Sequence, residues 1–184
     1  MSGSELADGD VLVQIGAAFS ATERFCSLLG YEEGTYHYSD KGMAAHGISA
    51  QQIAQAPRPS EVDAVFEAWL IAGLANRGYG TDAKRLVSVG FNVGGFDLPF
   101  VEKFLPRSYA LLSRRVVDLN AFLMAYGASG RDFETSSPKW SGWKRLAVQY
   151  AAQEITKQSL DVARHDAGYD ALEALYALEF LLAH

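Results

Sequence analysis

The sequence has few cysteines and no long apolar run. Cys26 is the single cysteine among 184 residues, so an intrachain disulfide and a metal site of several thiolates are both excluded. No stretch approaches the roughly 18 consecutive apolar residues of a membrane-spanning helix, and no basic segment followed by an apolar one marks a secretory signal. We therefore expect a cytoplasmic protein that does not enter a membrane. Cys26 is expected to be a buried, unreactive thiol, with a reactive thiol as the alternative.

Basic residues are also in the minority. The chain has 16 Lys and Arg against 22 Asp and Glu, which gives a formal net charge of -6. This balance argues against a broadly basic surface that wraps nucleic acid without specificity. It is compatible with a small acidic metal centre that has a local basic rim. The length and the apolar fraction of 49% suit one domain, residues 1–184, with a sizeable core.

Apolar periodicity predicts strands first, and then strands that alternate with helices. Residues 11–20 and 23–30 predict an antiparallel hairpin that turns at Ala21 and Thr22. Further strands are expected over residues 85–92 and from residue 114, with a weaker candidate over 36–42. Helices are expected over residues 60–76, 97–105, 141–153 and 166–182, and the strand from residue 114 is expected to run into a further helix by residue 127. This order predicts a mixed β-sheet with helices on its faces.

Two of the predicted helices have a clear apolar face at helical spacing. Ser60 and Asp63 resemble a capping box at the start of the first of them. Its expected buried positions are Val62, Val65, Phe66, Trp69, Leu70, Gly73 and Leu74. The expected apolar seam of the last helix consists of Ala167, Ala171, Leu175, Leu178 and Leu182.

The stretch "SVGFNVGGFDLPFV", residues 88–101, is the first candidate for chemistry. A strand ends near Asn92, and Gly94 and Gly95 allow a tight turn or a positive φ. Asp97 then falls in the first turn of a helix, where the helix N-terminus favours a carboxylate. The alternative is a purely structural carboxylate beside a turn asparagine.

The stretch "ARHDAGYDALEALYAL", residues 163–178, is the second candidate. His165 lies at the start of the last helix, and Asp170 lies near the edge of its apolar seam. A carboxylate there is costly unless it is hydrogen-bonded or binds a cation. Small residues around Gly168 let another backbone approach closely. The alternative is that Asp166 caps the helix and Asp170 is solvated.

Together the two stretches resemble the motifs of the DEDD exonuclease superfamily, in its DEDDh branch, which includes proofreading exonucleases, RNase T and oligoribonuclease. The longer form of the family's N-x-x-F-D motif is matched by Asn92, Phe96 and Asp97. Its H-x-A-x-x-D-A motif is matched by His165, Ala167, Asp170 and Ala171. The segments "VLVQIGAAF" and "AAHGISAQQIAQAPRPSEV" extend the similarity over nearly the whole chain. The resemblance implies a ribonuclease H-like mixed β-sheet flanked by α-helices.

The resemblance also implies an activity: 3′–5′ hydrolysis of phosphodiester bonds at single-stranded DNA or RNA 3′ ends, with two Mg²⁺ or Mn²⁺ ions. Asp170 would bind the metal that holds the attacking water, and Asp97 would support the second metal. His165 would be the general base, because the pKa of a histidine lies near working pH. Some members of the family dimerise, so a homodimer is a further expectation.

The family has one more motif, Asp-x-Glu, on a strand that precedes "VLVQIGA". Residues 1–10 contain no Asp-x-Glu, since Glu5 and Asp8 stand in the wrong order. We expect that the first strand and two of the four metal-binding carboxylates are missing from an N-terminally truncated chain, and that Met1 follows directly after the missing Glu. Residues 1–184 should then be impaired or inactive. The alternative is a non-catalytic relative that binds nucleic acid or a protein partner.

Four residues are candidates for binding the substrate. Asn92 and Phe96 belong to the first motif. Trp140 and Lys144 lie in "PKWSGWKRLA", where aromatic and basic side chains can stack on bases and hold phosphates. The alternative for this second segment is that its aromatic residues pack in the core and its charges are solvated.

Overall fold

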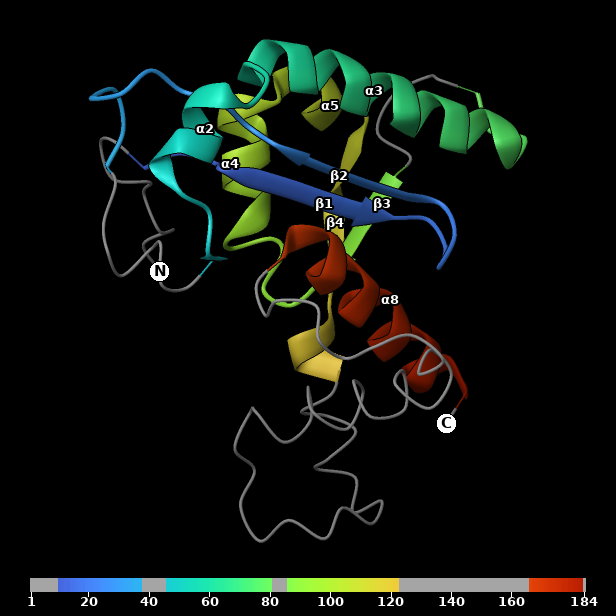
Figure 1. Cartoon of the computed structure of the whole chain (residues 1–184). Coiled ribbons are helices and arrows are strands. Elements are labelled where there is room, and N and C mark those ends of the chain that lie inside the picture. The colour runs from blue at the N-terminus through green and yellow to red at the C-terminus, as the bar shows by residue number, and fades with distance from the viewer. Residues whose placement is uncertain (1–9, 38–45, 81–85, 123–165, 184) are drawn as a thin grey trace, which may run out of the picture.

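The structure is a computed structural model that describes residues 10–37, 46–80, 86–122 and 166–183 (Figure 1). Two strands come first, and strands and helices then alternate along the chain, as the sequence predicts. The elements are β1 (Gln14–Ala18), β2 (Arg24–Leu28), α2 (Ala50–Gln55), α3 (Pro59–Asn76), β3 (Leu86–Gly90), α4 (Asp97–Phe104), α5 (Pro106–Tyr109), β4 (Leu112–Asp118) and α8 (Ala167–Ala183). This is an α/β arrangement, and the predicted helix over residues 141–153 lies outside the described ranges.

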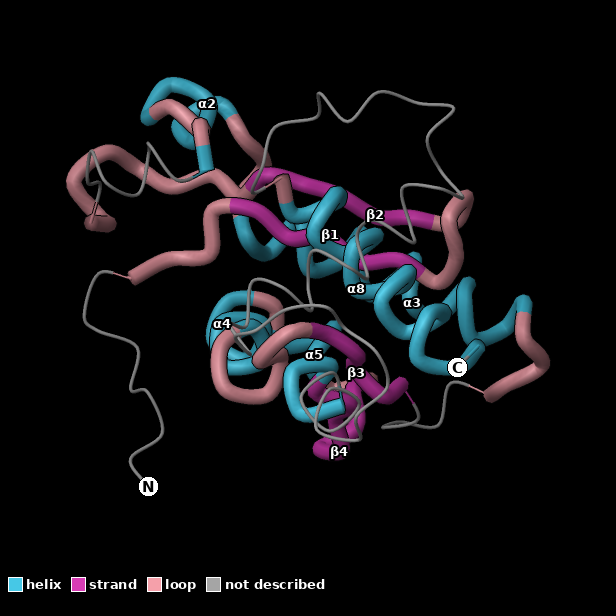
Figure 2. The backbone as a smooth tube through the Cα atoms, turned by 90° about the horizontal axis from the view of Figure 1, so that it is seen from below, coloured by secondary structure: helices cyan, strands magenta, loops and turns pink. Residues whose placement is uncertain are grey.

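The strands form one antiparallel and one parallel pair. β1 and β2 are a hairpin in which Gln14 is opposite Leu28. β3 and β4 run parallel, with Gly90 opposite Asp118. Within the described residues these are two separate two-stranded sheets (Figure 2). The weak candidate over residues 36–42 is wrong for its first two residues, which are not in a strand, and the rest of it lies outside the described part.

Helices cover the hairpin on both sides. In Figure 1, α3 lies over one face of β1 and β2, and α8 lies against the other. α8 also contacts β3, and α3 contacts α4 and α5, so the helices connect the two strand pairs. The main core lies among α3, α4, α5 and the hairpin, and consists of Leu29, Val62, Phe66, Leu70, Val101, Leu105 and Leu111. A second cluster joins Leu119 to Ala174 and Ala177 of α8.

α3 has the predicted core face but a different N-terminus. Pro59 opens the helix, and the Glu61 carboxylate accepts a hydrogen bond from the Arg58 amide at 2.8 Å. The predicted Ser60–Asp63 capping box is wrong, because Asp63 points into the protein and is 2% exposed. Val65 was expected in the core but is 61% exposed, since it lies on the side of α3 that faces away from the hairpin.

Asp63 joins α3 to the short helix α5. Its carboxylate accepts hydrogen bonds from the amides of Arg107 and Ser108 at 3.0 and 2.9 Å, and from the Ser108 hydroxyl at 2.7 Å. These amides belong to the first turn of α5, whose donors have no partner within the helix. A fully satisfied buried carboxylate therefore fixes the junction between the two helices.

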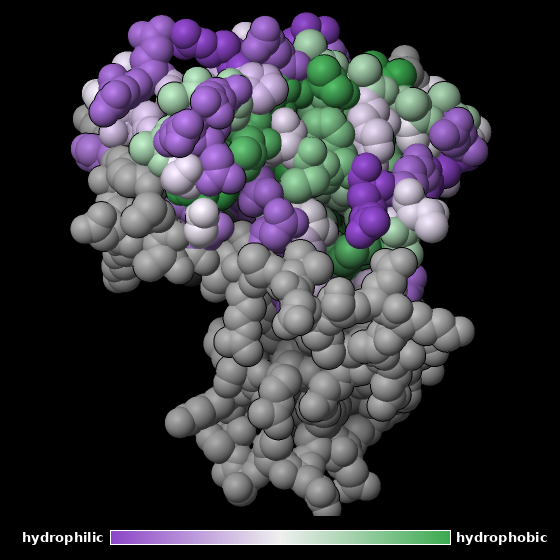
Figure 3. Space-filling model, in the orientation of Figure 1, coloured by the Kyte–Doolittle hydropathy of each residue, from purple (hydrophilic) through white to green (hydrophobic). Residues whose placement is uncertain are grey.

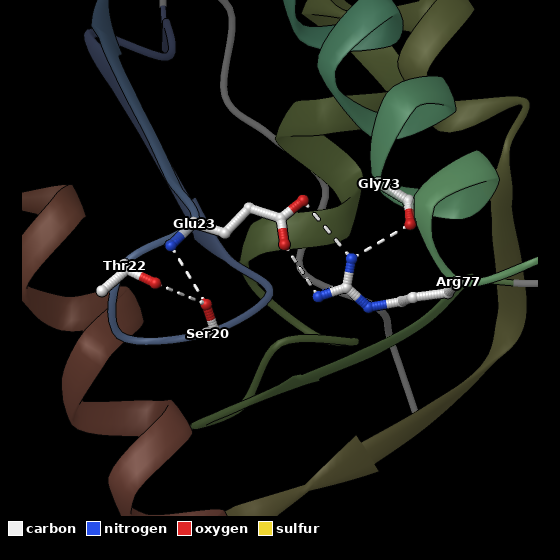
Figure 4. A network of polar contacts seen from close by, with 5 residues as sticks. All are labelled: Ser20, Thr22, Glu23, Gly73 and Arg77. Carbon is white, nitrogen blue, oxygen red and sulfur yellow. Dashed lines mark hydrogen bonds and ion pairs between the residues drawn. The ribbon is translucent and has the colours of Figure 1, made fainter.

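The turn of the β1–β2 hairpin is joined to the end of α3 (Figure 4). The Arg77 guanidinium forms an ion pair with the Glu23 carboxylate at 2.9 Å and donates to the Gly73 carbonyl at 3.0 Å. The Glu23 amide donates to the Ser20 hydroxyl at 3.1 Å. Arg77 also lies over the Phe19 ring, 4.4 Å from its centroid. These contacts fix the hairpin turn on α3.

The apolar seam of α8 differs from the predicted one. The buried positions are Ala174, Tyr176 and Ala177, whereas Leu182 is 79% exposed. Leu178 of the predicted seam and Leu181 in the last turn pack against the cluster around Leu119, so the seam is shifted around the helix and Leu182 is left outside it. Apolar and hydrophilic side chains are interspersed on the described surface in Figure 3. Across the described ranges, no helix is both long and apolar enough to cross a membrane.

Candidate functional site

The turn between β3 and α4 is built on Asn92. Its φ is 58°, in the left-handed region that asparagine tolerates better than most residues. The Asn92 amide donates to the Asp118 carboxylate at 3.1 Å, and its carbonyl accepts from the Phe96 amide at 2.9 Å. Asp118, at the end of β4, was not predicted from sequence to have any role. It holds the turn that leads into Asp97.

Gly94 and Gly95 have a different role from the predicted one. Neither has a positive φ; Asn92 supplies it instead. The glycines are needed for space, because a Cβ on Gly95 would lie 2.8 Å from the Asn92 side-chain oxygen and one on Gly94 would lie 3.2 Å from Val116. The turn is tight, as predicted, but the glycines are required because a Cβ at either position would crowd its neighbours.

Asp97 is the first residue of α4, as predicted from sequence. Loss of water around its carboxyl group raises its pKa to about 6, the hydrogen bond from its own backbone amide acts in the opposite direction, and the Asp170 charge raises it further. The residue as a whole is exposed, so solvent screens part of the energetic consequence. An upward pKa shift is expected for a carboxyl group whose negative charge is not compensated by a nearby cation.

Asp170 approaches Asp97 from another element. It lies in the first turn of α8, where its amide donates to the Asp166 carbonyl at 2.9 Å. The Asp170 charge acts on the pKa of Asp97, so the two carboxylates lie within electrostatic range of each other although they are far apart in sequence. α8 contacts β3, the strand that leads to Asp97.

The N-terminus of α8 is attached to β1 through side chains. The Asp166 carboxylate accepts from the Tyr169 amide at 3.0 Å, which is the capping role considered from sequence. Gln14 of β1 donates to the other oxygen of Asp166 at 2.7 Å and accepts from the Ala167 amide at 3.1 Å. Sequence analysis missed Gln14; the available signal was a polar residue inside the apolar run "VLVQIGA".

The small residues at the start of α8 permit the close approach that the sequence predicts. A Cβ on Gly16 would overlap the Ala167 carbonyl, and a Cβ on Gly168 would lie 3.2 Å from the Cβ of Cys26. Cys26 is exposed, so the prediction of a buried thiol is wrong. Partial burial and the Asp166 charge raise its pKa, because the residue lies on the strand face that α8 partly covers. A raised pKa disfavours the reactive thiolate.

Of the remaining predicted site residues, Phe96 and Asn92 are exposed to solvent, and three others lie outside the residues that the structure describes. Phe96 is 59% exposed, and its ring lies 5.4 Å from that of Phe100. Asn92 is exposed beside it. His165, Trp140 and Lys144 lie outside the described residues.

The donor set of the site suits a hard divalent cation only in part. Asp97 and Asp170 offer carboxylate oxygens, and Mg²⁺ is commonly held by one or two carboxylates together with waters and substrate phosphates. Within the described ranges, no group of three or more His, Cys, Asp and Glu side chains could hold a metal ion. The two described carboxylates alone are therefore fewer ligands than a protein-held metal site commonly has.

No protein-family model matches the chain, and no curated protein matches it significantly.

Proposed function

We propose that the chain is the catalytic domain of a metal-dependent 3′–5′ exonuclease that acts on single-stranded DNA or RNA 3′ ends. The observation that carries the proposal is the approach of Asp97 and Asp170. Two motifs chosen for their resemblance to one exonuclease family supply two carboxylates, and the charge of one raises the pKa of the other. Like charges at such a site are a cost to folding that a bound cation would offset.

The strand arrangement supports a ribonuclease H-like fold. An antiparallel hairpin and a parallel pair both contact α8. Every residue of β1 is only half-buried, and Val87 of β3 is 47% exposed, whereas the central strands of a covered sheet are normally buried. We propose that the two pairs belong to one mixed sheet of the ribonuclease H-like type.

The proposed chemistry assigns each side chain a separate part. Divalent ions would supply charge neutralisation at the leaving oxygen and lower the pKa of a bound water. Asp170 and Asp97 would hold these ions through their carboxylate oxygens. His165 would accept the proton of the attacking water. The exposed ring of Phe96 would contact the terminal base, and Trp140 and Lys144 would contact the strand further on.

The 184-residue chain should have low activity. The described site contributes the carboxylates of Asp97 and Asp170, and an ion held by few protein oxygens is bound weakly. Activity should rise when a strand carrying Asp-x-Glu is added ahead of residue 11.

The test compares residues 1–184 with a chain extended by the in-frame codons upstream of Met1. Each is incubated with Mg²⁺ or Mn²⁺ and a single-stranded oligonucleotide labelled at its 5′ end. We expect stepwise shortening from the 3′ end by the extended chain, loss of shortening with a chelator, and loss in Asp97→Asn and Asp170→Asn. Glu33→Gln, at an exposed position, is the matched control and should keep full activity. Shortening that survives Asp170→Asn, or an upstream reading frame without Asp-x-Glu, would contradict the proposal.

A second candidate is a non-catalytic protein that binds nucleic acid or a protein partner. The absence of Asp-x-Glu from residues 1–10 and of a three-ligand group among the described residues favours it. Fluorescence anisotropy with a labelled oligonucleotide separates the two functions. Binding that needs no divalent metal and is unchanged in Asp97→Asn supports the non-catalytic function, whereas metal-dependent binding supports the exonuclease.

A further inference from the structure

Gln14 is the polar side chain of β1 that contacts α8. It stands in the middle of the apolar stretch "VLVQIGA" and is half-buried. Its two amide atoms are used differently: Nε2 donates to the Asp166 carboxylate at 2.7 Å, and Oε1 accepts from the Ala167 amide at 3.1 Å. The Tyr169 amide donates to the second oxygen of Asp166 at 3.0 Å. One side chain therefore contacts both the cap and the first residue of the helix.

This set of bonds requires a donor and an acceptor on the same side chain. Glutamate at position 14 could accept from Ala167 but would place a second negative charge against Asp166. Leucine could make neither bond. A hydrogen bond to an ionised group is stronger than one between neutral groups, so the bond from Gln14 to Asp166 is the dominant one.

Close backbone packing fixes where α8 lies along β1. Gly16, two residues along β1, lies so close to the Ala167 carbonyl that a Cβ would overlap it. α8 therefore cannot slide along β1 without losing either this close packing or the Gln14 bonds. Asp170 follows Asp166 by one helical turn, and its amide donates to the Asp166 carbonyl at 2.9 Å. Because this hydrogen bond joins the two residues within one turn of α8, a displacement of Asp166 should also displace Asp170.

We propose that Gln14 is a positioning residue: its hydrogen bonds to Asp166 and Ala167 fix α8 on β1 and thereby set the approach of Asp170 to Asp97. The consequence for metal binding rests on the proposed function, whereas the consequence for the position of α8 does not. Gln14 itself touches neither carboxylate of the site.

The experiment uses three changes at the contact and one elsewhere. Gln14→Leu removes both bonds, and Gln14→Glu replaces the donor by a negative charge. The double variant Gln14→Glu/Asp166→Asn restores a donor–acceptor pair with the roles exchanged, and asparagine is also a good helix cap. Arg77→Met is the control, because it breaks the ion pair with Glu23 at the far end of the hairpin.

The first readout is amide hydrogen exchange in the whole chain. Gln14→Leu should raise the exchange rates of Ala167 and Tyr169 about tenfold relative to those of the hairpin, which corresponds to the loss of a charged hydrogen bond. Gln14→Glu should do the same, and the double variant should restore slow exchange. Arg77→Met should not single out these amides. Uniform acceleration over all amides in Gln14→Leu, or no recovery in the double variant, would overturn the proposal.

The second readout is the affinity for Mn²⁺ alone, followed by line broadening at the amides of Asp97 and Asp170. Residues that orient metal ligands typically contribute about tenfold or more to affinity, so we expect a loss of about that size in Gln14→Leu and wild-type affinity in Arg77→Met. Equal losses in these two variants would contradict the positioning role. If the wild-type chain binds no Mn²⁺, the proposed function fails, and the exchange rates still decide the role of Gln14.

Discussion

Asp63 and Asp97 are the same type of residue in opposite surroundings. Asp63, at the α3–α5 junction, is 2% exposed and accepts three hydrogen bonds from the start of α5. Asp97, at the start of α4, is exposed at the surface, and both water loss and the Asp170 charge raise its pKa. The first carboxylate stabilises the fold. The ionised form of the second is disfavoured, which suits the proposed role of Asp97 at a cation site.

The comparison teaches that burial alone does not identify a functional acid. What separates the two residues is whether the protein supplies enough donors or positive charge to balance the carboxylate. At the α3–α5 junction it does, and at the α4–α8 site the described residues bring two negative charges together. Substitutions should therefore have opposite effects on stability at the two places.

The largest effect is expected at Asp63. Asp63→Ala should lower the free energy of unfolding by about 3 kcal/mol, because it leaves the amides of Arg107 and Ser108 without an acceptor. The Ser108 hydroxyl can still donate to the carbonyl of residue 63. Urea denaturation followed by circular dichroism measures this loss. Asp63→Asn, which keeps one acceptor oxygen, should cost less. A loss below about 1 kcal/mol in Asp63→Ala would mean that water replaces the carboxylate at this junction.

Gly16→Ala tests the contact between β1 and α8. The new Cβ would overlap the Ala167 carbonyl, and forcing extra volume into such a contact costs about 2 kcal/mol. The loss should appear in the thermal midpoint. Gly90→Ala is the matched control, since its Cβ would lie 3.2 Å from the side chain of Val93 and should be tolerated better. Equal losses in the two variants would contradict a close contact at Gly16.

Asp97→Asn should have the opposite sign to Asp63→Asn. Removing the charge relieves the repulsion from Asp170 and should raise the free energy of unfolding at neutral pH by less than about 1 kcal/mol, because solvent screens an exposed charge. Mn²⁺ binding should be lost at the same time. Chemical denaturation and Mn²⁺ titration of the same sample measure both effects. A destabilised Asp97→Asn would show that this carboxylate is structural.

The pH dependence of stability has a defined sign at Asp97. Its folded-state pKa of about 6 lies above its ordinary value of 3.8, so between these two pH values the folded state retains a proton that the unfolded state has released. The Asp97 contribution to stability should therefore fall as pH rises from about 4 to about 7. Denaturation of wild type and Asp97→Asn over this range isolates it: the difference should grow with pH, by less than about 1 kcal/mol. A difference that stays constant would contradict the raised pKa.

The smallest effect is expected at the hairpin turn. Arg77→Met removes the ion pair with Glu23, whose side chains are 35% and 31% exposed, and the contact with Phe19. Such partly exposed pairs contribute about 0.5 kcal/mol, and the methionine side chain retains part of the packing on the ring. Thermal denaturation at low and high salt should show a small loss that shrinks as salt is added. A loss as large as that of Asp63→Ala would place this turn in the structural core.

Much of the described fold could be predicted from periodicity. The β1–β2 hairpin, the core face of α3 and the start of α4 at Asp97 all follow from patterns within short windows. Tertiary features could not be predicted in this way. The inward turn of Asp63 depends on α5, which is far along the chain, and the exposure of Val65 and Leu182 depends on which helix faces have a neighbour.

Sequence motifs suggested the candidate site residues, but they did not reveal the residues that hold those candidates in position. Asp97 and Asp170 follow from motifs, since the motifs name chemistry-bearing residues. Asn92 was expected to follow a strand, yet its positive φ and its bond to Asp118 arise from the pairing of β3 with β4. Gln14 supports α8 from a strand about 150 residues earlier, which local patterns do not reveal.

The most direct test of the central claim is a Mn²⁺ titration of the 184-residue chain observed by amide NMR. The proposed site predicts line broadening that begins at the amides around Asp97 and Asp170, competes with Mg²⁺, and disappears in Asp97→Asn while remaining in Glu33→Gln. Broadening that is absent from these amides, or that is unchanged in Asp97→Asn, would show that the two carboxylates do not form a metal site.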